Sequence, residues 1–342
     1  MKKKVVNIGV LGTGRIGRLH IENIMRRIPE ARVAAVVDVV EETARRCAEE
    51  FGIRKVSTNP EDVFSDPNIE AVLICTSTDT HADLIVAAAE AGKHIFCEKP
   101  IALNLEEIDR ALFAVQKNRV KFMVGFNRRF DPNFAKAKEL LLHGAIGKPE
   151  LLRITSRDPA PPSLDYIRRS GGMFLDMTIH DFDMACFLLG EEVVEVYAVG
   201  EALVDPRIKE AEDIDTAVIT LRFQSGALGV IDNSRRAAYG YDQRVEILGE
   251  KGMIRVENPR PHTVTVWNTS GENGPTLFSF FMDRYTEAFV QELRAFVSSL
   301  CEGRDPPVSG EEGRRPVVLA LAAKKSLEEK RPVRPSEVDP RR

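Results

Sequence analysis

The sequence predicts an α/β protein with an N-terminal doubly wound parallel sheet, followed by an α+β domain with a large, mostly antiparallel open sheet. In the first 125 residues, short β-branched runs alternate with helix-like stretches, as in parallel βαβ units. A G-x-G-x-x-G segment follows the first of these runs. Beyond residue 126, strand-like runs succeed one another at turn signals, which is typical of antiparallel sheets. We therefore expect two domains, 1–125 and 126–342.

The composition is that of an ordinary globular protein, with 43% hydrophobic and 29% charged residues in a chain of 342. A net charge of -4 gives no electrostatic case for binding nucleic acid or an anionic membrane. No apolar run is long enough to span a bilayer. The five cysteines are scattered without a C-x-x-C pair, which indicates free thiols in the cytoplasm and neither disulfides nor a zinc site.

The first strand is expected over 5–11, and it leads directly into Gly12-Thr13-Gly14-Arg15-Ile16-Gly17. A helix over 18–27 and a strand over 33–37 follow, which is the context that a dinucleotide-binding motif requires. Gly12 permits a tight turn, Gly14 admits a pyrophosphate close to the backbone, and Gly17 allows close helix–strand packing. We therefore predict a Rossmann domain whose loop 12–17 binds the cofactor phosphates, with a plain turn as the alternative.

Asp38 ends the second strand and follows Gly17 at about the 20-residue interval expected for this motif. Its carboxylate would accept hydrogen bonds from the adenosine ribose and repel a 2′-phosphate, and Val39-Val40 add no cation. The sequence therefore favours NAD over NADP, although Arg45 and Arg46 lie further along. The alternative is that Asp38 has only a structural role at the end of the strand.

The rest of the first domain continues the alternation of strands and helices. Strands are expected over 55–57, 71–75, 94–97 and 121–125, and helices over 43–51, 60–64, 82–91 and 105–116, the last capped by Asn104.

Polar segments follow two of these strands at their carboxyl ends, the edge where open α/β sheets bind ligands. The first contains Thr76, Ser77, Thr78 and His81, which we expect to approach the cofactor or to cap the next helix. The second is Cys97-Glu98-Lys99-Pro100. We predict that Lys99 stands between the cofactor and a substrate hydroxyl; an ordinary exposed lysine is the alternative.

The second domain is expected to begin with a helix over 130–143. Seven strands are expected over 150–156, 193–201, 216–223, 227–233, 244–249, 253–257 and 263–267, and two late helices over 282–301 and 310–329. The tail from Arg331 is expected to fray.

One helix, expected over 173–189, interrupts the strands and contains Asp176 and His180. Four residues apart on one helix, they would share a face. A carboxylate beside an imidazole orients the ring and favours its protonated form, which suits a general base near neutral pH. The alternatives are a surface pair worth about 0.2–0.5 kcal/mol, or a metal site with Asp183 or Asp176. No second histidine has ligand spacing, so we expect no metal.

Together these segments resemble the Gfo/Idh/MocA oxidoreductase family and, within it, the inositol 2-dehydrogenases. The resemblance covers nearly the whole chain, through residues 12–17, 98–100, 124–131, 156–159, 171–183, 239–242 and 284–285. The E-K-P and D-x-x-x-H segments are the most specific, whereas S-R-D-P and Y-G-Y-D point toward inositol.

The resemblance implies an NAD-dependent oxidation of myo-inositol to 2-keto-myo-inositol. His180 would take the hydroxyl proton, Asp176 would orient His180, and Lys99 would stabilise the developing alkoxide. The implied cofactor-binding residues are those of loop 12–17 with Asp38, Thr76, Ser77, Thr78, His81, Glu98 and Lys99. The implied substrate-binding residues are Lys99, Arg128, Asp158, Asp176, His180 and one of Tyr239 and Tyr241. The family also implies a homotetramer.

Other activities fit the same motifs. The substrate could be scyllo-inositol, another cyclitol or a pyranose sugar. A non-catalytic NAD-binding regulator, or a variant resembling biliverdin reductase or a glycosidase, would share the scaffold. The presence of Lys99, Asp176 and His180 argues against these last possibilities.

Overall fold

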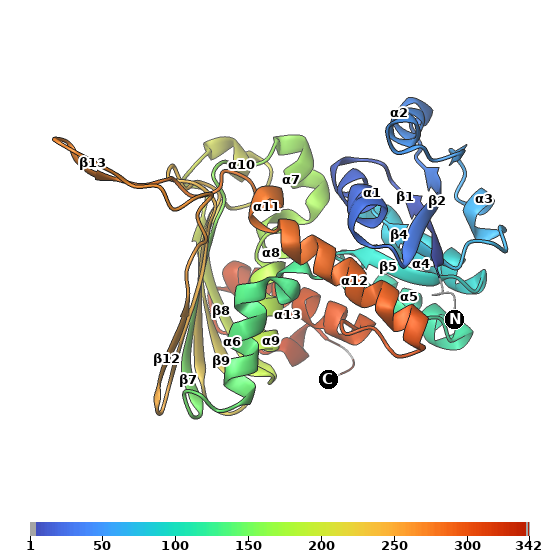
Figure 1. The fold of residues 1–342 in the computed structure, drawn as a ribbon. Coiled ribbons are helices and arrows are strands. Elements are labelled where there is room, and N and C mark those ends of the chain that lie inside the picture. Colours follow the sequence, from blue (N-terminus) through green and yellow to red (C-terminus); the bar gives the residue numbers. More distant parts are fainter. Residues whose placement is uncertain (1–4, 340, 342) are drawn as a thin grey trace. The chain divides into compact units, whose positions relative to one another are not determined.

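A computed structural model describes residues 5–339 and 341 of the chain, which divides into two compact units (Figure 1). The first unit contains the residues up to Phe130 together with Glu287–Val317, and the second contains Asp131–Thr286 together with the residues from Val318 onward. The segment Glu287–Val317, which the sequence placed in the second domain, therefore belongs with the first unit. It adds to the edge of the sheet there, since the Val124 amide donates to the Val308 carbonyl at 3.2 Å.

The first unit is built on a parallel sheet, as predicted. Its strands are β1 (Val6–Leu11), β2 (Ala31–Val37), β3 (Lys55–Ser57), β4 (Ala71–Ile74), β5 (His94–Glu98) and β6 (Phe122–Gly125). The strand order is β3-β2-β1-β4-β5-β6, with every pair parallel. This is a doubly wound sheet whose order reverses beside β1, where such sheets bind nucleotides.

The helical elements of this unit follow the predicted alternation. They are α1 (Arg15–Arg27), α2 (Glu41–Phe51), α3 (Glu61–Phe64), η1 (Thr78–Thr80), α4 (His81–Glu90), α5 (Leu105–Asn118), η2 (Asn127–Phe130) and most of α12 (Thr286–Glu302). Asn104 caps α5 as predicted, because its side chain accepts from the Glu107 amide at 2.9 Å. The capping role considered for the hydroxyls before α4 is wrong: neither Ser77 nor Thr80 makes a side-chain cap hydrogen bond.

The second unit contains a six-stranded sheet that is mostly antiparallel, as predicted. Its strands are β7 (Pro149–Arg157), β8 (Val193–Glu201), β9 (Thr216–Phe223), β10 (Leu228–Ser234), β11 (Asp242–Gly249) and β12 (Gly252–Val256). The order is β12-β11-β7-β10-β9-β8, in which only β7 and β10 pair in parallel. The hairpin of β13 (Val266–Asn268) and β14 (Gly271–Asn273) extends away from this sheet (Figure 1).

The two faces of this sheet have different surroundings. Helices α6 (Pro132–Leu142) and α9 (Ile179–Leu189) lie along one face, where Ile219 and Ile231 are fully buried (Figure 1). Residues of the other face include large apolar side chains that remain exposed, namely Val199, Val218, Leu228 and Leu248. Charged residues lie among them on the same face, including the Arg157–Asp232 and Arg153–Glu246 ion pairs.

Two expectations for the second domain are wrong. The single helix expected over 173–189 is two helices, α8 (Gly172–Asp176) and α9, separated at Met177 and Thr178. The tail from Arg331 is ordered through Asp339, because Val333 is fully buried and forms a β-bridge with Val196.

Other elements differ more modestly from the predictions. The helix expected over 282–301 is divided into α11 (Phe281–Arg284) and α12, whereas α13 (Gly310–Glu329) has the predicted bounds. The short elements α7 (Leu164–Ser170), α10 (Pro206–Glu210), β14 and η3 (Pro335–Glu337) were not predicted. Elements of three to seven residues contain too few turns or alternations to give a clear hydrophobic period.

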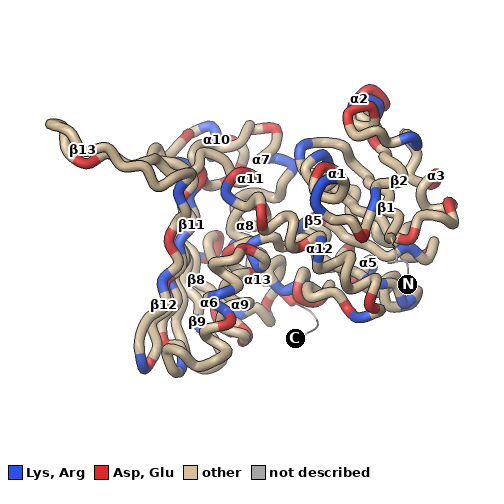
Figure 2. The backbone as a smooth tube through the Cα atoms, in the orientation of Figure 1, with Lys and Arg blue, Asp and Glu red and all other residues tan. Residues whose placement is uncertain are grey.

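Within the described part of the chain, no helix combines the length and the apolar character needed to cross a bilayer. Figure 2 shows basic and acidic residues interspersed along each unit, in keeping with the small net charge of -4.

Candidate functional site

The glycine loop between β1 and α1 has the close packing that its motif predicts. Gly12 has φ +90°, and a Cβ there would lie 2.6 Å from the Cys75 carbonyl oxygen. A Cβ at Gly17 would overlap the Gly12 carbonyl oxygen. At Gly14 the position of a Cβ meets nothing within 4 Å, which leaves open space beside the start of α1. Glycine is therefore required at 12 and 17 by the protein itself, whereas the space at Gly14 suits an approaching phosphate.

Asp38 lies beside this loop at the end of β2. Its Oδ2 accepts from the amide and the hydroxyl of Thr13 at 2.8 and 2.9 Å, and its Oδ1 accepts from the Val40 amide at 3.0 Å. Val39 is 89% exposed and adds no charge, and Arg45 is paired with Glu41 on α2. The surroundings of Asp38 thus fit ribose hydroxyls better than a 2′-phosphate.

Three loops of the first unit emerge at one edge of its sheet. The register pairs Leu11 with Ile74 and Ile74 with Cys97, so the segments after β1, β4 and β5 begin side by side. In the second of these loops, Thr76 and Thr78 are half-buried and Ser77 is exposed. This edge brings together the glycine loop, the hydroxyl cluster and the segment with Lys99, as the sequence predicted.

His81 is buried and connects two of these loops. One ring nitrogen lies 2.8 Å from the Pro100 carbonyl oxygen, and the other lies 3.1 Å from that of Thr76. Burial lowers the pKa of His81, against the opposing effect of the two carbonyls. Both ring nitrogens therefore face backbone groups, so any influence of His81 on a cofactor passes through the loops that it holds.

Lys99 stands immediately after β5, half-buried, and the Lys99–Pro100 peptide bond is cis. The preceding carboxylate, Glu98, is turned toward α1, where its Oε1 lies 2.6 Å from His20 Nε2. Arg128 is buried in η2, just beyond the end of β6. Its neighbour Arg129 forms an ion pair with Glu312 at 2.6 Å.

In the second unit, Asp176 ends α8 and is held from two sides. Its Oδ1 accepts from Tyr166 Oη at 2.8 Å, and its Oδ2 accepts from Arg235 Nη2 at 3.2 Å. Arg235 is buried, and its Nη1 lies 3.8 Å from Asp158 Oδ2. One buried guanidinium thus joins two predicted site carboxylates, Asp158 and Asp176.

His180 lies in the first turn of α9, so the regular i,i+4 relationship predicted for Asp176 and His180 needs correction. The amides of Met177 and Thr178 both donate to the Met173 carbonyl, at 2.9 and 3.0 Å, and the His180 amide donates to the Met177 carbonyl at 3.3 Å. A hydrogen bond that spans five positions, from Thr178 to Met173, is followed by one that spans three, from His180 to Met177. These replace the regular α-helical hydrogen bonds, which span four positions. Local turn geometry, and not one helix face, therefore places the two side chains.

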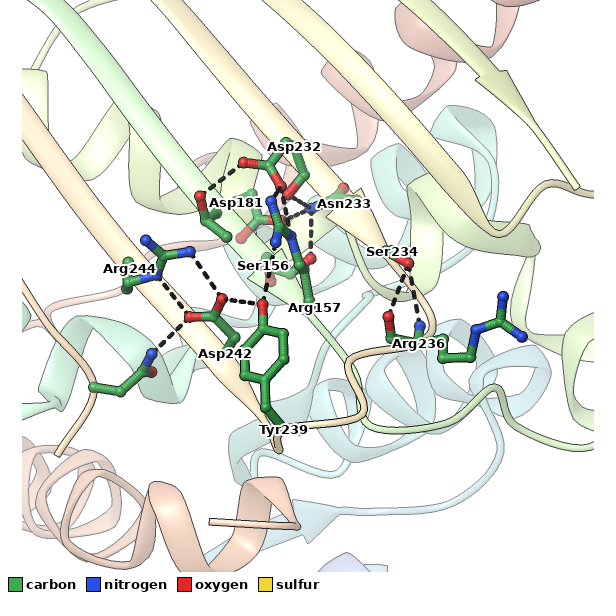
Figure 3. Close-up of polar contacts among 12 residues, drawn as sticks. Ser156, Arg157, Asp181, Asp232, Asn233, Ser234, Arg236, Tyr239, Asp242 and Arg244 are labelled. Atoms are coloured by element: carbon green, nitrogen blue, oxygen red, sulfur yellow. Dashed lines mark hydrogen bonds and ion pairs between the residues drawn. The ribbon is translucent and has the colours of Figure 1, made fainter. Parts of the chain in front are cut away.

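The turn between α8 and α9 is tied to the sheet by a buried polar network. Thr178 Oγ1 donates to Asn233 Oδ1 at 2.6 Å. Asn233 Nδ2 in turn donates to Asp181 Oδ2 at 2.8 Å (Figure 3). Asn233 belongs to β10, two residues before Arg235. The same strand end therefore fixes the turn and carries the guanidinium that holds Asp176.

The two candidate tyrosines have different environments. Tyr239 is 49% exposed, and its hydroxyl donates to Asp242 Oδ2 at 2.7 Å and accepts from Arg157 Nη1 at 3.1 Å (Figure 3). Burial is the largest of the effects that raise the pKa of Tyr239. Tyr241 is buried and packs edge-on against Tyr285, with ring centroids 6.1 Å apart. Tyr239 is therefore the more exposed of the two tyrosines, and its hydroxyl is held by Arg157 and Asp242.

Sequence reasoning missed Tyr166 and Arg235. Tyr166 lies on the short helix α7, whose few residues give no periodic signal. For Arg235 a signal was present: two carboxylates assigned to one site require a cation, and Ser234-Arg235-Arg236 follows a predicted strand.

Comparisons with known proteins extend these observations. Residues 6–126 match the NAD-binding Rossmann fold of an oxidoreductase family, and residues 134–255 match the GFO/IDH/MocA C-terminal domain. The chain is 54% identical to a myo-inositol 2-dehydrogenase of Thermotoga maritima over 97% of this chain and 99% of the relative. It is 46% identical to an inositol 2-dehydrogenase of Rhizobium meliloti, over 96% and 98% of the two chains.

A solved structure of scyllo-inositol dehydrogenase from Lactobacillus casei, with bound NAD(H) and scyllo-inositol, superposes with a TM-score of 0.92. That protein is 34% identical, and the match covers 97% of this chain and all of the other. The chain belongs to the Gfo/Idh/MocA family of NAD-binding oxidoreductases.

Proposed function

We propose that this protein oxidises myo-inositol to 2-keto-myo-inositol with NAD. The observation that supports it most directly is that Arg235 contacts both Asp158 and Asp176. Tyr166 donates a hydrogen bond to the same Asp176, which precedes His180 in the sequence. A cyclitol has a hydroxyl on every ring carbon, so its recognition needs fixed donors and acceptors close together. Two relatives that cover nearly the whole chain have inositol dehydrogenase names.

The cofactor roles follow from the edge of the first sheet. Loop 12–17 and the start of α1 would hold the pyrophosphate, and Asp38 would accept from the adenosine ribose. Thr76, Ser77 and Thr78 would line the cofactor, while His81 and Glu98 would fix the loops around Lys99. Bound NAD supplies the hydride acceptor.

The chemical step requires a base and a stabilised oxyanion. His180 takes the proton from the reacting hydroxyl, and Asp176 orients the ring and stabilises its protonated form. The ammonium group of Lys99 stabilises the alkoxide that develops as the proton leaves. Arg128, Asp158 and one of Tyr239 and Tyr241 bind the remaining hydroxyls.

A second substrate has independent support. The Lactobacillus casei protein bound scyllo-inositol in its solved structure, and it is 34% identical to this chain. The two isomers differ only in the orientation of one hydroxyl, so the same polar residues would serve either one. A panel of myo-inositol, scyllo-inositol and glucose, each with NAD and with NADP, decides between them by kcat/KM for the formation of reduced nicotinamide. The proposal requires myo-inositol with NAD to be the best pair.

We also propose a homotetramer that works in the cytoplasm. The exposed face of the second sheet, where Val199, Val218, Leu228 and Leu248 lie among ion-paired residues, is the surface that would pair with its copy. All five cysteines are free, as expected in a reducing compartment.

A further inference from the structure

Three ionisable side chains from three elements of the first unit come together around Glu98, the residue before Lys99. His20 comes from α1, Glu98 from the end of β5, and Glu292 from α12. His20 and Glu292 are fully buried, and the Glu98 side chain is 15% exposed. One nitrogen or oxygen of each lies within 4.8 Å of the others. The reaction proposed above makes no use of a proton or charge on Glu292.

The hydrogen bonds of this cluster are incomplete without one more proton. His20 Nε2 and Glu98 Oε1 are 2.6 Å apart. With an ionised Glu98, the ring nitrogen is the donor of this hydrogen bond, because a carboxylate can only accept. Among the described residues, neither carboxylate oxygen of Glu292 has a hydrogen-bond donor. An ionised carboxylate buried without any donor is strongly disfavoured.

Among the described residues, no positive charge is found among the causes that shift the pKa of Glu292. The His20 ring packs edge-on against Phe96 and against Phe289, with centroids 5.4 and 5.9 Å away. Burial has the largest effect on Glu292, and the negative charge of Glu98 has the next largest. Both raise the pKa of Glu292 well above its ordinary value. Burial also raises the pKa of the Cys75 and Cys97 thiols far above 9.0, so these neighbours are neutral.

We propose that Glu292 is protonated at neutral pH and donates a hydrogen bond to Glu98, forming a buried His20–Glu98–Glu292 triad that positions Lys99. Glu98 then receives one hydrogen bond from α1 and one from α12. On its β6 side it is enclosed, since a Cβ at Gly125 would lie 3.3 Å from the Glu98 carboxyl group. The carboxylate is thus fixed on three sides, one residue before the lysine.

This arrangement would make Glu292 a positioning residue. The triad ties the end of β5 to α1, the helix that begins at the glycine loop. Lys99 and the phosphate-binding loop would therefore keep a constant spacing when a cofactor enters. Because one nitrogen and two carboxylates could instead surround a divalent cation, the experiment must distinguish a proton from a metal.

Infrared difference spectroscopy between the wild type and Glu292→Gln tests the protonation state without any substrate. The proposal predicts a protonated-carboxyl band in the wild type at neutral pH that the variant lacks, and no stoichiometric metal by elemental analysis. The control is Glu302→Gln, an exposed position on the same helix, which should leave that band unchanged. A carboxylate band in place of the protonated one, with or without a bound divalent ion, would overturn the proposal.

Stability gives a second readout that does not depend on the reaction. A raised pKa means that the folded protein retains a proton that the unfolded chain loses above about pH 4.5, so wild-type stability falls as pH rises above that point. Glutamine mimics the protonated acid at every pH. The Tm of Glu292→Gln relative to wild type should therefore increase from about pH 5 to about pH 8. A constant difference would contradict the proposal.

The positioning role is tested by activity and rests on the proposed function. Glu292→Ala should lower kcat about tenfold with little change in the KM for NAD, and Glu292→Gln should restore kcat. Equal loss in both variants, with both folded, would overturn the role of the proton. If the wild type itself oxidises no polyol, the proposed function fails, while the infrared and stability results still decide the protonation of Glu292.

Discussion

Arg235 donates from Nη2 to Asp176 Oδ2 at 3.2 Å, and its Nη1 lies 3.8 Å from Asp158 Oδ2. A guanidinium stays protonated at any pH at which the protein folds. This one is buried, so one fixed charge is shared by two carboxylates assigned to the substrate. Several consequences of this and other contacts can be measured.

Replacing Arg235 with Met should lower both stability and activity. Removing one partner of a buried ion pair leaves charge uncompensated, at about 3–5 kcal/mol. Without the cation, the neighbouring carboxylates lose the charge that favours their ionised form, so the acid limb of the kcat/KM profile should move to higher pH. Thermal unfolding and a pH–rate profile check this, with the exposed neighbour Arg236→Met as control. An unchanged acid limb in a folded variant would contradict the assignment.

Removing the Tyr166 hydroxyl should affect catalysis more than cofactor binding. Tyr166→Phe deletes the 2.8 Å hydrogen bond to Asp176, and hydrogen bonds to charged groups contribute about 1.5–3 kcal/mol. We expect kcat to fall by about 10- to 100-fold, with an unchanged KM for NAD. Tyr197→Phe on β8 is the matched control. A rise in the KM for NAD with kcat intact would show that Tyr166 serves a different purpose.

Two glycines of the cofactor loop should respond differently to alanine. Gly17→Ala places a methyl group against the Gly12 carbonyl oxygen and should destabilise the fold by about 1–3 kcal/mol. Gly14→Ala meets no protein atom within 4 Å, so the variant should fold normally and lose affinity for NAD. Thermal unfolding with calorimetric titration of NAD separates the effects. Normal NAD affinity in Gly14→Ala would show that the cofactor phosphate does not occupy the space beside Gly14.

Asp38 should determine the choice of cofactor. Asp38→Ser combined with Val39→Arg removes the repulsion of a 2′-phosphate and adds a cation beside it. The ratio of kcat/KM for NADP over NAD should rise by at least about tenfold. Val39→Ser alone serves as control, since Val39 is exposed. A ratio that stays constant in the double variant would show that the ribose lies elsewhere.

A charge on the exposed sheet face should prevent assembly. Val218→Glu, in the middle of β9, would bury a carboxylate in the proposed contact between copies. Sedimentation velocity should show tetramers for the wild type and smaller species for this variant. Glu49→Gln, at an exposed position on α2 of the first unit, is a control that should assemble normally. A wild type that sediments as a monomer would refute the assembly.

The sequence anticipated elements whose patterns are long and regular. The bounds of β8, β9 and α13 agree with the expected ranges, because an alternating or 3.6-residue period extends over the whole element. The glycine loop and Asp38 were also found, since their order along the chain is itself the signal.

The features that were not predicted depend on contacts between residues that are distant in the sequence. The turn at Met177 and Thr178 lies inside an apolar, helix-like run and is fixed by Asn233, which is distant in sequence. Arg235, the residue that follows the same strand, reaches Asp176. Val333 is ordered because it pairs with Val196, a partner that the tail's own composition does not indicate.

The oxidation of myo-inositol is tested most directly by kcat/KM for NAD reduction in the wild type, His180→Ala and Lys99→Ala. His143→Ala and Lys117→Ala, both at exposed positions, are the matched controls. We predict that reduced nicotinamide accumulates with myo-inositol, that each site variant loses at least about 100-fold, and that both controls retain activity. Tight binding of NADH without turnover of any cyclitol or pyranose would contradict the account and indicate a non-catalytic regulator.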